Sequence, residues 1–450
     1  MKYSLSIKEI SDAVDGKIIC GDENRTITAV STDSRLLNDE TLFIPIKGER
    51  FDGHDFLGNA SAAITGRDVE PARGRAYIRT GDTVKAFGKI AKYYKAKYPL
   101  PTVSVVGSVG KTTTRDMVAA VLSEKYNTLK TEKNYNNDIG VPMMVMKISE
   151  AHEAAVLELG MSALGEIEYL ADIVRPDTLV MTNIGMSHIE NLGSQENIFK
   201  AKMEGTKFLT AENTVVANFD DAFLKTVGDY GDYKVLSYAV EADADIKAEN
   251  IRDLGFDGVE FDAVYRGVSY RVRLFVPGVH NVYNALAAFG AGVVHGVEPE
   301  AIVKGLMKTE FTSMRMEVKN AGNIKIINDC YNASPSSMEA ALDVLSNETS
   351  SRRVAVLGDI FEMGDFAPPA HEELGKSAAK KADVLVCAGE NAAYMAKGAE
   401  ALGEVHYFKT TDEAADAING IVKDGDTVLI KASRGMHFEK IFNKITEGRN

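Results

Sequence analysis

The arrangement of apolar and polar positions divides the chain into three parts. From Met1 to about Tyr98, short apolar runs such as 41–46 alternate with polar turns and lead into a basic stretch with helical spacing at 85–97. The segment YPLPT follows, and its two prolines restrict the backbone and interrupt helices, as is typical of a linker. We therefore predict a small α/β domain at 1–98.

The second part, residues 99–313, opens with the pattern of a strand, a glycine-rich turn and a helix. The β-branched run Thr102–Val106 predicts a buried strand, and the apolar residues of TTTRDMVAAVLSEKY recur at helical spacing. Further strands are predicted at 154–157 and 178–181, whereas 214–276 is richer in antiparallel strand patterns. These elements predict a central α/β domain of the mononucleotide-binding, P-loop type.

After about Ser313, strand and helix patterns alternate regularly. Apolar runs such as IKIIN, RRVAVLGD, DVLVCAG and TVLIKAS are separated by amphipathic segments such as PSSMEAALDVLS and HEELGKSAAKKA. This alternation predicts a parallel, doubly wound sheet with right-handed crossovers. We therefore assign residues 314–450 to a C-terminal Rossmann-like domain.

Composition limits the classes of partner. The formal net charge of −14 argues against a nucleic acid, because no excess of Lys and Arg is present to replace counterions, so an anionic ligand would need a focused local site. Cys20, Cys330 and Cys387 form no close pair, and we expect buried thiols in a reducing compartment. No stretch has the length of a membrane span and the N-terminus lacks a signal-peptide core, so we expect a cytoplasmic protein without a membrane partner.

The segment GSVGKTTT, residues 107–114, is the clearest chemical motif. Between a strand and a helix, a glycine-rich loop can wrap its amides around phosphate oxygens, with Lys111 neutralising the β- and γ-phosphates and Thr112 ligating magnesium. Val105 stands where the longer nucleotide-loop pattern has glycine, so the shorter GxxGKT form is the one that fits. An ordinary helix-capping turn is the alternative, but the strand, lysine and threonines together favour ATP or GTP.

Four further residues are weaker candidates. Glu158 ends an apolar run, where the carboxyl end of a strand would direct its carboxylate at the same crevice and towards magnesium. Asn183 and His188 follow another strand in a loop. Taken alone, Glu158 is read as a turn residue, His188 as structural and Lys202 as a solvated lysine.

Taken together and in order, seven motifs resemble those of the Mur ligases over essentially the whole chain: GSVGKTTT, YNNDIGVP, LELGM, TNIGMSHIENLGS, AKMEG, GVHNVYNALAA and KASRGMHFE. Two more, DCYNASPSSMEAAL and LGDIFEMGDFAPPAHEELG, are similar to those of members that add D-alanyl-D-alanine. The resemblance implies an ATP-dependent ligase that joins this dipeptide to the terminal carboxylate of UDP-N-acetylmuramoyl-tripeptide through an acyl phosphate, releasing ADP and phosphate.

The resemblance also implies roles at the nucleotide. Thr112 and Glu158 would hold one magnesium ion, and His188 and a carbamylated Lys202 would contribute to the site of a second. With Lys111, the residues Glu158, His188 and Lys202 form the expected catalytic set. Asn284 would contact adenine, Arg315 a phosphate and Asp329 the ribose, although Met314 stands where a glycine is common. The expected ATP-binding residues are Gly107, Ser108, Val109, Gly110, Lys111, Thr112, Thr113, Asn284, Arg315 and Asp329.

Substrate contacts are implied in the first and third domains. STDSR and IKGERFDGH resemble UDP-sugar-binding segments, although alone they are typical of turns and helix caps. The expected residues there are Ser31, Asp33, Ser34, Arg35, Lys47, Gly48, Asp52 and Gly53. Asn136 and Asn137 would lie near the sugar or peptide. Asn332, Ser334 and Arg434 would contact the incoming dipeptide, with Ser334 in place of a commoner asparagine.

Other functions remain open at this stage. Another ATP-dependent amide ligase of the same architecture, either a different amino-acid-adding Mur ligase or a folylpolyglutamate synthase-like protein, is disfavoured by YNASP and HEELG. A non-catalytic nucleotide-binding protein is disfavoured by the intact Glu158, His188 and Lys202. We expect a monomer whose third domain closes onto the central one when ligands bind, and both lysine and diaminopimelate remain open as the precursor's third residue.

Overall fold

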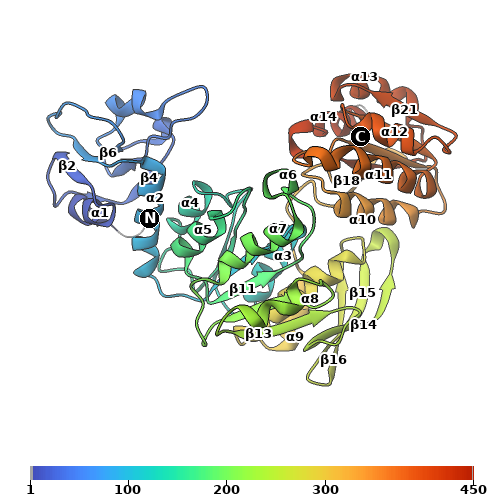
Figure 1. Cartoon of the computed structure of the whole chain (residues 1–450), viewed down its shortest axis with the longest axis horizontal. Helices are drawn as coiled ribbons and strands as arrows, with labels where there is room; N and C mark the ends of the chain where they lie inside the picture. The colour runs from blue at the N-terminus through green and yellow to red at the C-terminus, as the bar shows by residue number, and fades with distance from the viewer. Residues whose placement is uncertain (1–3, 448, 450) are drawn as a thin grey trace.

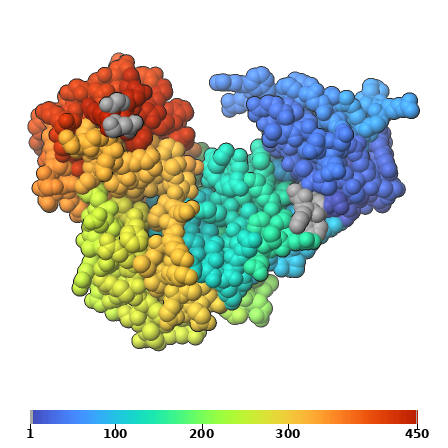
Figure 2. Space-filling view, turned by 180° about the vertical axis from the view of Figure 1, so that it is seen from behind, coloured from blue at the N-terminus to red at the C-terminus, as the bar shows by residue number. Residues whose placement is uncertain are grey.

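The computed structural model describes residues 4–447 and 449 and contains three sheet-based units along the chain (Figure 1). A five-stranded sheet with a two-stranded sheet precedes a nine-stranded central sheet, and a six-stranded sheet follows it. The N-terminal and C-terminal units lie on opposite sides of the central unit, and a hollow separates them in the space-filling view (Figure 2). The predicted α/β, three-domain class is confirmed. Within the described residues, no helix combines the length and apolar character needed to cross a membrane.

In the N-terminal unit, the larger sheet has the order β2-β7-β6-β5-β4, and β4 to β7 run parallel. Because parallel strands end at the same edge, the loops that follow β4 and β5 leave the sheet together. The elements are β1 (Leu5–Ser6), α1 (Ile7–Ala13), β2 (Lys17–Cys20), β3 (Thr26–Ile27), β4 (Ala29–Ser31), β5 (Thr41–Phe43), β6 (Ala62–Thr65), β7 (Ala76–Arg79) and α2 (Thr83–Ala96).

Helix α2 attaches this unit to the next one. Asp82 caps its start by accepting from the Val84 and Lys85 amides. Further along, Lys92 Nζ lies 2.8 Å from the Asp172 carboxylate, and the Tyr94 hydroxyl donates to the Ile148 carbonyl at 2.6 Å. The helix therefore packs on the central unit as well as on its own.

The central sheet has the order β16-β15-β14-β13-β12-β11-β8-β10-β9. Antiparallel pairing was expected over 214–276, but it holds only from β14 to β16, since β12 and β13 continue the parallel sheet. Strand β12 is buried along its whole length, as suits a parallel strand covered on both faces. The strands are β8 (Thr102–Val106), β9 (Thr128–Lys130), β10 (Ala154–Glu158), β11 (Thr178–Met181), β12 (Thr214–Asn218), β13 (Lys234–Ala239), β14 (Ile246–Asp253), β15 (Val259–Tyr265) and β16 (Val268–Leu274).

Strand β8 lies between β10 and β11, so the loops that follow these three parallel strands meet at one edge of the sheet. This is the position at which open α/β sheets bind ligands. The helices of the unit are α3 (Lys111–Leu122), α4 (Gly140–Val145), α5 (Glu166–Val174), α6 (Ile189–Leu192), α7 (Gln195–Met203), α8 (His280–Val294) and α9 (Pro299–Met307).

The C-terminal sheet has the order β17-β18-β22-β19-β20-β21, with an unpredicted antiparallel edge strand, β17. Along β19, Val354 and Val356 face one apolar cluster, whereas Ala355 and Leu357 face the other, so both faces of the sheet are covered. This confirms the doubly wound prediction. The elements are β17 (Glu317–Ala321), β18 (Ile324–Asn328), α10 (Pro335–Ser346), β19 (Arg353–Gly358), α11 (Ala367–Lys381), β20 (Val384–Ala388), α12 (Ala392–Gly398), β21 (Val405–Phe408), α13 (Thr411–Ile421), β22 (Thr427–Lys431) and α14 (Glu439–Thr446).

The cysteines follow this architecture. Cys330 and Cys387 are buried, as expected, and burial raises the pKa of each thiol to about 12. Cys20 is only partly buried because it ends β2, the edge strand of the N-terminal sheet.

Candidate active site

A cleft of about 1200 Å³ lies between the central and C-terminal units. It is lined by the loops after β8, β10 and β11, by α8 and by residues from the start of the C-terminal unit. The residues predicted from sequence that line it are Ser108, Val109, Gly110, Lys111, Thr112, Thr113, Asn136, Asn137, Glu158, His188, Asn284, Arg315, Asp329, Asn332, Ser334 and Arg434. Gly107 and Lys202 are buried beside this set rather than exposed on the cleft wall.

The loop at 107–110 has the shape of an anion site. Gly107 and Gly110 have φ of +152° and +84°, and a Cβ at Gly110 would lie 2.6 Å from Asn284 Oδ1. Helix α3 begins at Lys111, so its first amides have no acceptor within the helix and carry the positive end of the helix dipole. Phosphate oxygens are the natural acceptors for such amides.

The loop after β11 holds the phosphate loop in place. Asn183 Oδ1 accepts from the Val109 amide and its Nδ2 donates to the Val109 carbonyl, both at 3.0 Å. The Gly185 amide donates to Ser108 Oγ at 2.9 Å. Asn183, which the sequence placed in a loop after a strand, therefore holds the phosphate loop in its conformation.

Lys111 folds back over its own loop. Its Nζ donates to the Gly107 carbonyl at 2.8 Å and lies 3.4 Å from the Ser108 carbonyl. Burial lowers the pKa of Lys111, while the Glu158 carboxylate opposes that shift. A phosphate in the loop would offer the ammonium a charged partner in place of these neutral carbonyls.

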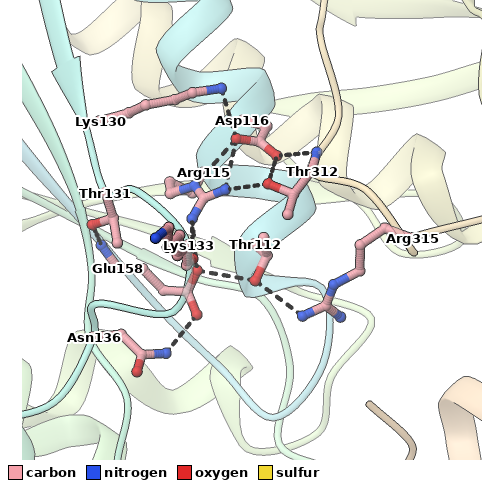
Figure 3. Close-up of polar contacts among 10 residues, drawn as sticks. All are labelled: Thr112, Arg115, Asp116, Lys130, Thr131, Lys133, Asn136, Glu158, Thr312 and Arg315. Carbon is pink, nitrogen blue, oxygen red and sulfur yellow. Dashed lines mark hydrogen bonds and ion pairs between the residues drawn. The ribbon is translucent and has the colours of Figure 1, made fainter. Parts of the chain in front are cut away.

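Glu158 is fixed from several sides (Figure 3). Its Oε2 accepts from Thr112 Oγ1 at 3.0 Å, and its Oε1 accepts from Asn136 Nδ2 at 2.8 Å. Its amide donates to Thr131 Oγ1 at 2.9 Å, and its side chain is buried. Glu158 is thus an oriented carboxylate beside the phosphate loop.

Lys202, on α7, is only 2% exposed. Burial and then the nearby charge of Lys111 lower the pKa of Lys202 well below its usual range, and in the described part of the chain no carboxylate forms an ion pair with it. Burial without a paired carboxylate favours the neutral amine over the ammonium form. The neutral amine is the form that can react with carbon dioxide.

The donor set fits magnesium. Thr112 and Glu158 supply the hard oxygen ligands that Mg²⁺ prefers. Among the described residues, no group of three or more His, Cys, Asp and Glu side chains is arranged around a metal position. Thr112 and Glu158 therefore suit a metal that one or two carboxylates hold together with substrate phosphates.

His188 connects the two walls of the cleft. It caps α6 with a left-handed φ of +64°, and its Nδ1 lies against the carboxylate of Glu362 in the C-terminal unit. The Glu190 amide also donates to the Glu362 carbonyl at 3.2 Å. His188 therefore faces the cleft but already has a partner across it.

The predicted adenine and ribose residues also have protein partners. Asn284 accepts from Thr114 Oγ1 at 3.0 Å and donates to Asn281 Oδ1 at 2.9 Å. Asp329 Oδ2 lies 2.5 Å from Lys431 Nζ, and its Oδ1 accepts from the Met316 amide at 3.1 Å. Both side chains are therefore held in defined orientations at the cleft.

Arg315 reaches from the C-terminal unit to the phosphate loop. Its Nη2 donates to Thr112 Oγ1 at 3.1 Å, and its guanidinium lies 4.2 Å from the centre of the Tyr331 ring. Met314 and Met316 on either side have φ of +60° and +48°. The backbone thus keeps a left-handed bend at Met314, the position where the sequence departs from the common glycine.

The residues predicted to contact the dipeptide, together with Asn137, which was predicted to lie near the sugar or peptide, divide into two groups. Asn332 is exposed, and Arg434 is half-exposed with long contacts to Glu439 at 3.4 Å and to Met314 Sδ at 3.8 Å, so both side chains are accessible to a ligand. Ser334 is the N-cap of α10, and Asn137 Oδ1 accepts from the Gly140 amide at 2.8 Å. These two have local structural roles in addition to facing the cleft.

The eight predicted sugar-nucleotide residues lie elsewhere, on the loops after β4 and β5 at one edge of the N-terminal sheet, and none of these described residues lines the cleft. Asp33 caps a short 3-10 helix and pairs with Arg35 at 2.6 Å. Asp52 caps another and accepts from the His54 amide at 2.9 Å. Six lie in or beside these two turns: Ser31, Asp33, Ser34, Arg35, Asp52 and Gly53. The backbones of Lys47 and Asp52 pair in an isolated antiparallel β-bridge, and Gly48 follows Lys47.

Sequence reasoning gave no role to Arg115, Asp116, Tyr331, Glu362 or Lys431. Arg115 carried one usable signal, since it follows Thr112 by three positions and so shares its face of α3. Other partners of these residues come from distant segments, such as Thr312 for Asp116 and His188 for Glu362, and the spacing of residues does not reveal them.

Comparison with known families agrees with this geometry. The family model described as "Mur ligase middle domain" matches residues 105–292, and the one described as "Mur ligase, glutamate ligase domain" matches residues 314–434. The UDP-N-acetylmuramoyl-tripeptide--D-alanyl-D-alanine ligase of Bacillus subtilis is 36% identical, over 98% of this chain and 98% of that protein. The Escherichia coli protein of that name is 32% identical, over 99% of each chain.

Solved structures give the same result. A crystal structure of MurF from Acinetobacter baumannii superposes with a TM-score of 0.92 at 30% identity, over 99% of each chain. The MurF ligase of Thermotoga maritima, solved in complex with ADP, superposes with a TM-score of 0.83 at 26% identity, over 93% of this chain and 97% of that one.

Proposed function

This chain belongs to the Mur ligase family, and we propose that it joins D-alanyl-D-alanine to the terminal carboxylate of UDP-N-acetylmuramoyl-tripeptide in peptidoglycan precursor synthesis. The protein is an ATP-dependent ligase. The observation that carries the proposal is the approach of Arg315 to Thr112, which brings the C-terminal unit to the phosphate loop beside Glu158. A site assembled from two units suits a reaction that unites a nucleotide, a precursor and a dipeptide.

We divide the work among three domains. Residues 1–98 would bind the UDP-sugar precursor, residues 99–313 ATP, and residues 314–450 ATP together with the incoming dipeptide. The position of the loops after β4 and β5 supports the first assignment, because they leave the same edge of the N-terminal sheet, away from the phosphate loop. We propose that the enzyme acts as a monomer, with no nucleic acid or membrane partner.

The ATP site would hold two magnesium ions. Thr112 and Glu158 would bind one, and His188 and a carbamate on Lys202 the other. When bound, magnesium would offset charge on the phosphoryl group during transfer. The lowered pKa of Lys202 supports the carbamate, because a neutral amine can attack carbon dioxide and the product is a carboxylate-like ligand.

The chemistry proceeds in two steps. The precursor's carboxylate attacks the γ-phosphorus of ATP, forming an acyl phosphate and ADP, because an unactivated carboxylate has no adequate leaving group. The dipeptide amine then attacks the acyl carbon, and inorganic phosphate leaves. Lys111 and the first amides of α3 would hold the phosphates, and Arg315 would add positive charge. Closure of the third domain would exclude water from the acyl phosphate.

An acceptor panel tests the proposal. Purified enzyme with ATP, magnesium and the tripeptide precursor should form product with D-alanyl-D-alanine but not with a single amino acid or glutamate. A preference for glutamate or one amino acid would instead assign the chain to another amide ligase of this architecture.

A further inference from the structure

A buried ion pair lies on α3 directly after the phosphate loop (Figure 3). Arg115 and Asp116 are each 1% exposed, although both are charged. Arg115 Nη2 lies 2.8 Å from Asp116 Oδ1, and Lys130 Nζ lies 2.9 Å from the same oxygen. Charged side chains are rarely buried this fully, and their desolvation is costly. Their burial at this position therefore indicates a specific role.

One end of the pair holds the segment between the units. Asp116 Oδ2 accepts from the Thr312 amide at 3.0 Å and from its hydroxyl at 2.9 Å. Arg115 Nη2 donates to the same Thr312 hydroxyl at 2.7 Å. Thr312 lies between α9 and β17, in the segment 308–316 that leads into the C-terminal unit.

The other end of the pair meets the carboxylate beside the phosphate loop. Arg115 Nη1 lies 3.6 Å from Glu158 Oε2, the oxygen that accepts from Thr112. Arg115 Nη1 also donates to the Lys133 carbonyl at 3.3 Å. The guanidinium is therefore fixed between Glu158 and Thr312.

These contacts close a ring across the two units. Thr312 precedes Arg315 by three residues, and Arg315 donates to Thr112. The ring runs from Thr112 through Glu158, Arg115 and Thr312 to Arg315 and back. A shift of segment 308–316 would therefore change both the position of Arg315 and the contact between Arg115 and the Glu158 carboxylate.

We propose that Arg115 and Asp116 are positioning residues that couple segment 308–316 to Glu158, so that metal binding at Glu158 and the placement of Arg315 are linked. This inference rests on the proposed function, in which Glu158 is a metal ligand. The coupling is reciprocal: a metal ion at Glu158 favours the Thr312 contact, and the Thr312 contact favours the metal ion.

Thr312→Val tests the coupling most cleanly, because it removes the hydroxyl contacts to both charged residues but keeps the shape and the backbone amide. Thr309→Val is its matched control, since Thr309 lies in the same segment and, among the described residues, its hydroxyl donates only to the Gly305 carbonyl, at 3.4 Å. Arg115→Lys is a second probe, because it keeps the positive charge but lacks the several N–H donors with which the guanidinium contacts Glu158 and Thr312 together.

Two measurements apply to each purified full-length variant. Mn²⁺ binding in the presence of ADP is followed by the loss of the free-ion electron paramagnetic resonance signal. Amide hydrogen exchange of 308–316 is compared with and without Mn²⁺ and ADP. We expect Thr312→Val to weaken Mn²⁺ binding about fivefold or more and to abolish the metal-dependent protection of 308–316, and Thr309→Val to change neither.

Equal effects of Thr312→Val and Thr309→Val on both readouts would overturn the coupling, since they would indicate only general loosening or no role. Glu158→Gln separates the two proposals. If Glu158→Gln weakens Mn²⁺ binding but Thr312→Val does not, the coupling alone is wrong. If Glu158→Gln leaves Mn²⁺ binding unchanged, the metal assignment fails, and this inference fails with it.

Discussion

Arg315 Nη2 lies 3.1 Å from Thr112 Oγ1, although the two residues belong to different sheet-based units. Thr112 is in the first turn of α3, where the helix amides face the cleft. The guanidinium is also held against the Tyr331 ring. If Arg315 contacts a phosphate as proposed, it can do so only when the two units are together, and we expect catalysis to depend on their arrangement.

Arg315→Ala should therefore lower the rate of ATP-dependent phosphate release by about a hundredfold, since a charged donor to the transferring phosphate is lost. The rate is measured at saturating ATP and precursor. Arg353→Gln is the matched control, because Arg353 pairs with Asp383 away from the cleft. Near-wild-type turnover of Arg315→Ala would remove Arg315 from the phosphate site.

Lys202→Ala should reduce product formation to near background, and small carboxylates added to the buffer should restore part of it. The reason is that burial favours the neutral amine of Lys202, the form that would have to react to give the proposed carbamate. Lys200→Ala, at an exposed position on the same helix, should remain active. Full activity of Lys202→Ala without added carboxylate would rule out the carbamate.

Position 314 should tolerate glycine better than a β-branched residue. Met314 has φ of +60°, a conformation that costs an L-residue about 1–2 kcal/mol and that valine adopts with more difficulty. Met314→Gly should keep the KM for ATP, whereas Met314→Val should raise it by shifting Arg315. The reverse order in steady-state kinetics would show that the left-handed bend does not position Arg315.

Acid should weaken the loop that carries Glu362. His371 is fully buried, accepts from the Ile360 amide at 3.0 Å and donates from Nδ1 to the Ala367 carbonyl at 2.7 Å. Burial lowers the pKa of His371 below its usual value of 6.5, so its stabilising contribution is full above pH 6.5 and is lost as the pH falls towards the folded-state pKa.

Calorimetric comparison of wild type with His371→Gln checks this prediction. The wild type should have the higher Tm by several degrees at pH 8, because the variant disturbs buried hydrogen bonds worth about 1–3 kcal/mol. The difference should shrink at pH 5.5. A difference that grew as the pH fell would mean that the folded state favours the charged imidazole.

Much of the fold was visible in the sequence because long parallel strands leave continuous apolar runs. Thr102–Val106 and Thr178–Met181 are strands with the predicted bounds. The antiparallel prediction for 214–276 was wrong for β12 and β13, because pairing direction depends on neighbours that an apolar run does not identify.

In the candidate site, too, local features could be predicted from the sequence, whereas contacts between distant segments could not. The phosphate loop is local, so its glycines, Lys111 and Thr112 could be predicted from spacing and are adjacent in the structure. Lys202 reads as a solvated lysine in isolation, and only the resemblance singled it out. The Arg115–Thr312 contact joins residues 197 positions apart, so no local pattern could have shown it.

One assay tests the ligase assignment most directly. Phosphate release from ATP is measured with the tripeptide precursor and magnesium, with and without D-alanyl-D-alanine, while the peptide product is followed by mass spectrometry. Release that depends on the dipeptide, together with a product heavier by one dipeptide unit, is the predicted result. Release without such a product, from both the lysine and the diaminopimelate precursor, would contradict it.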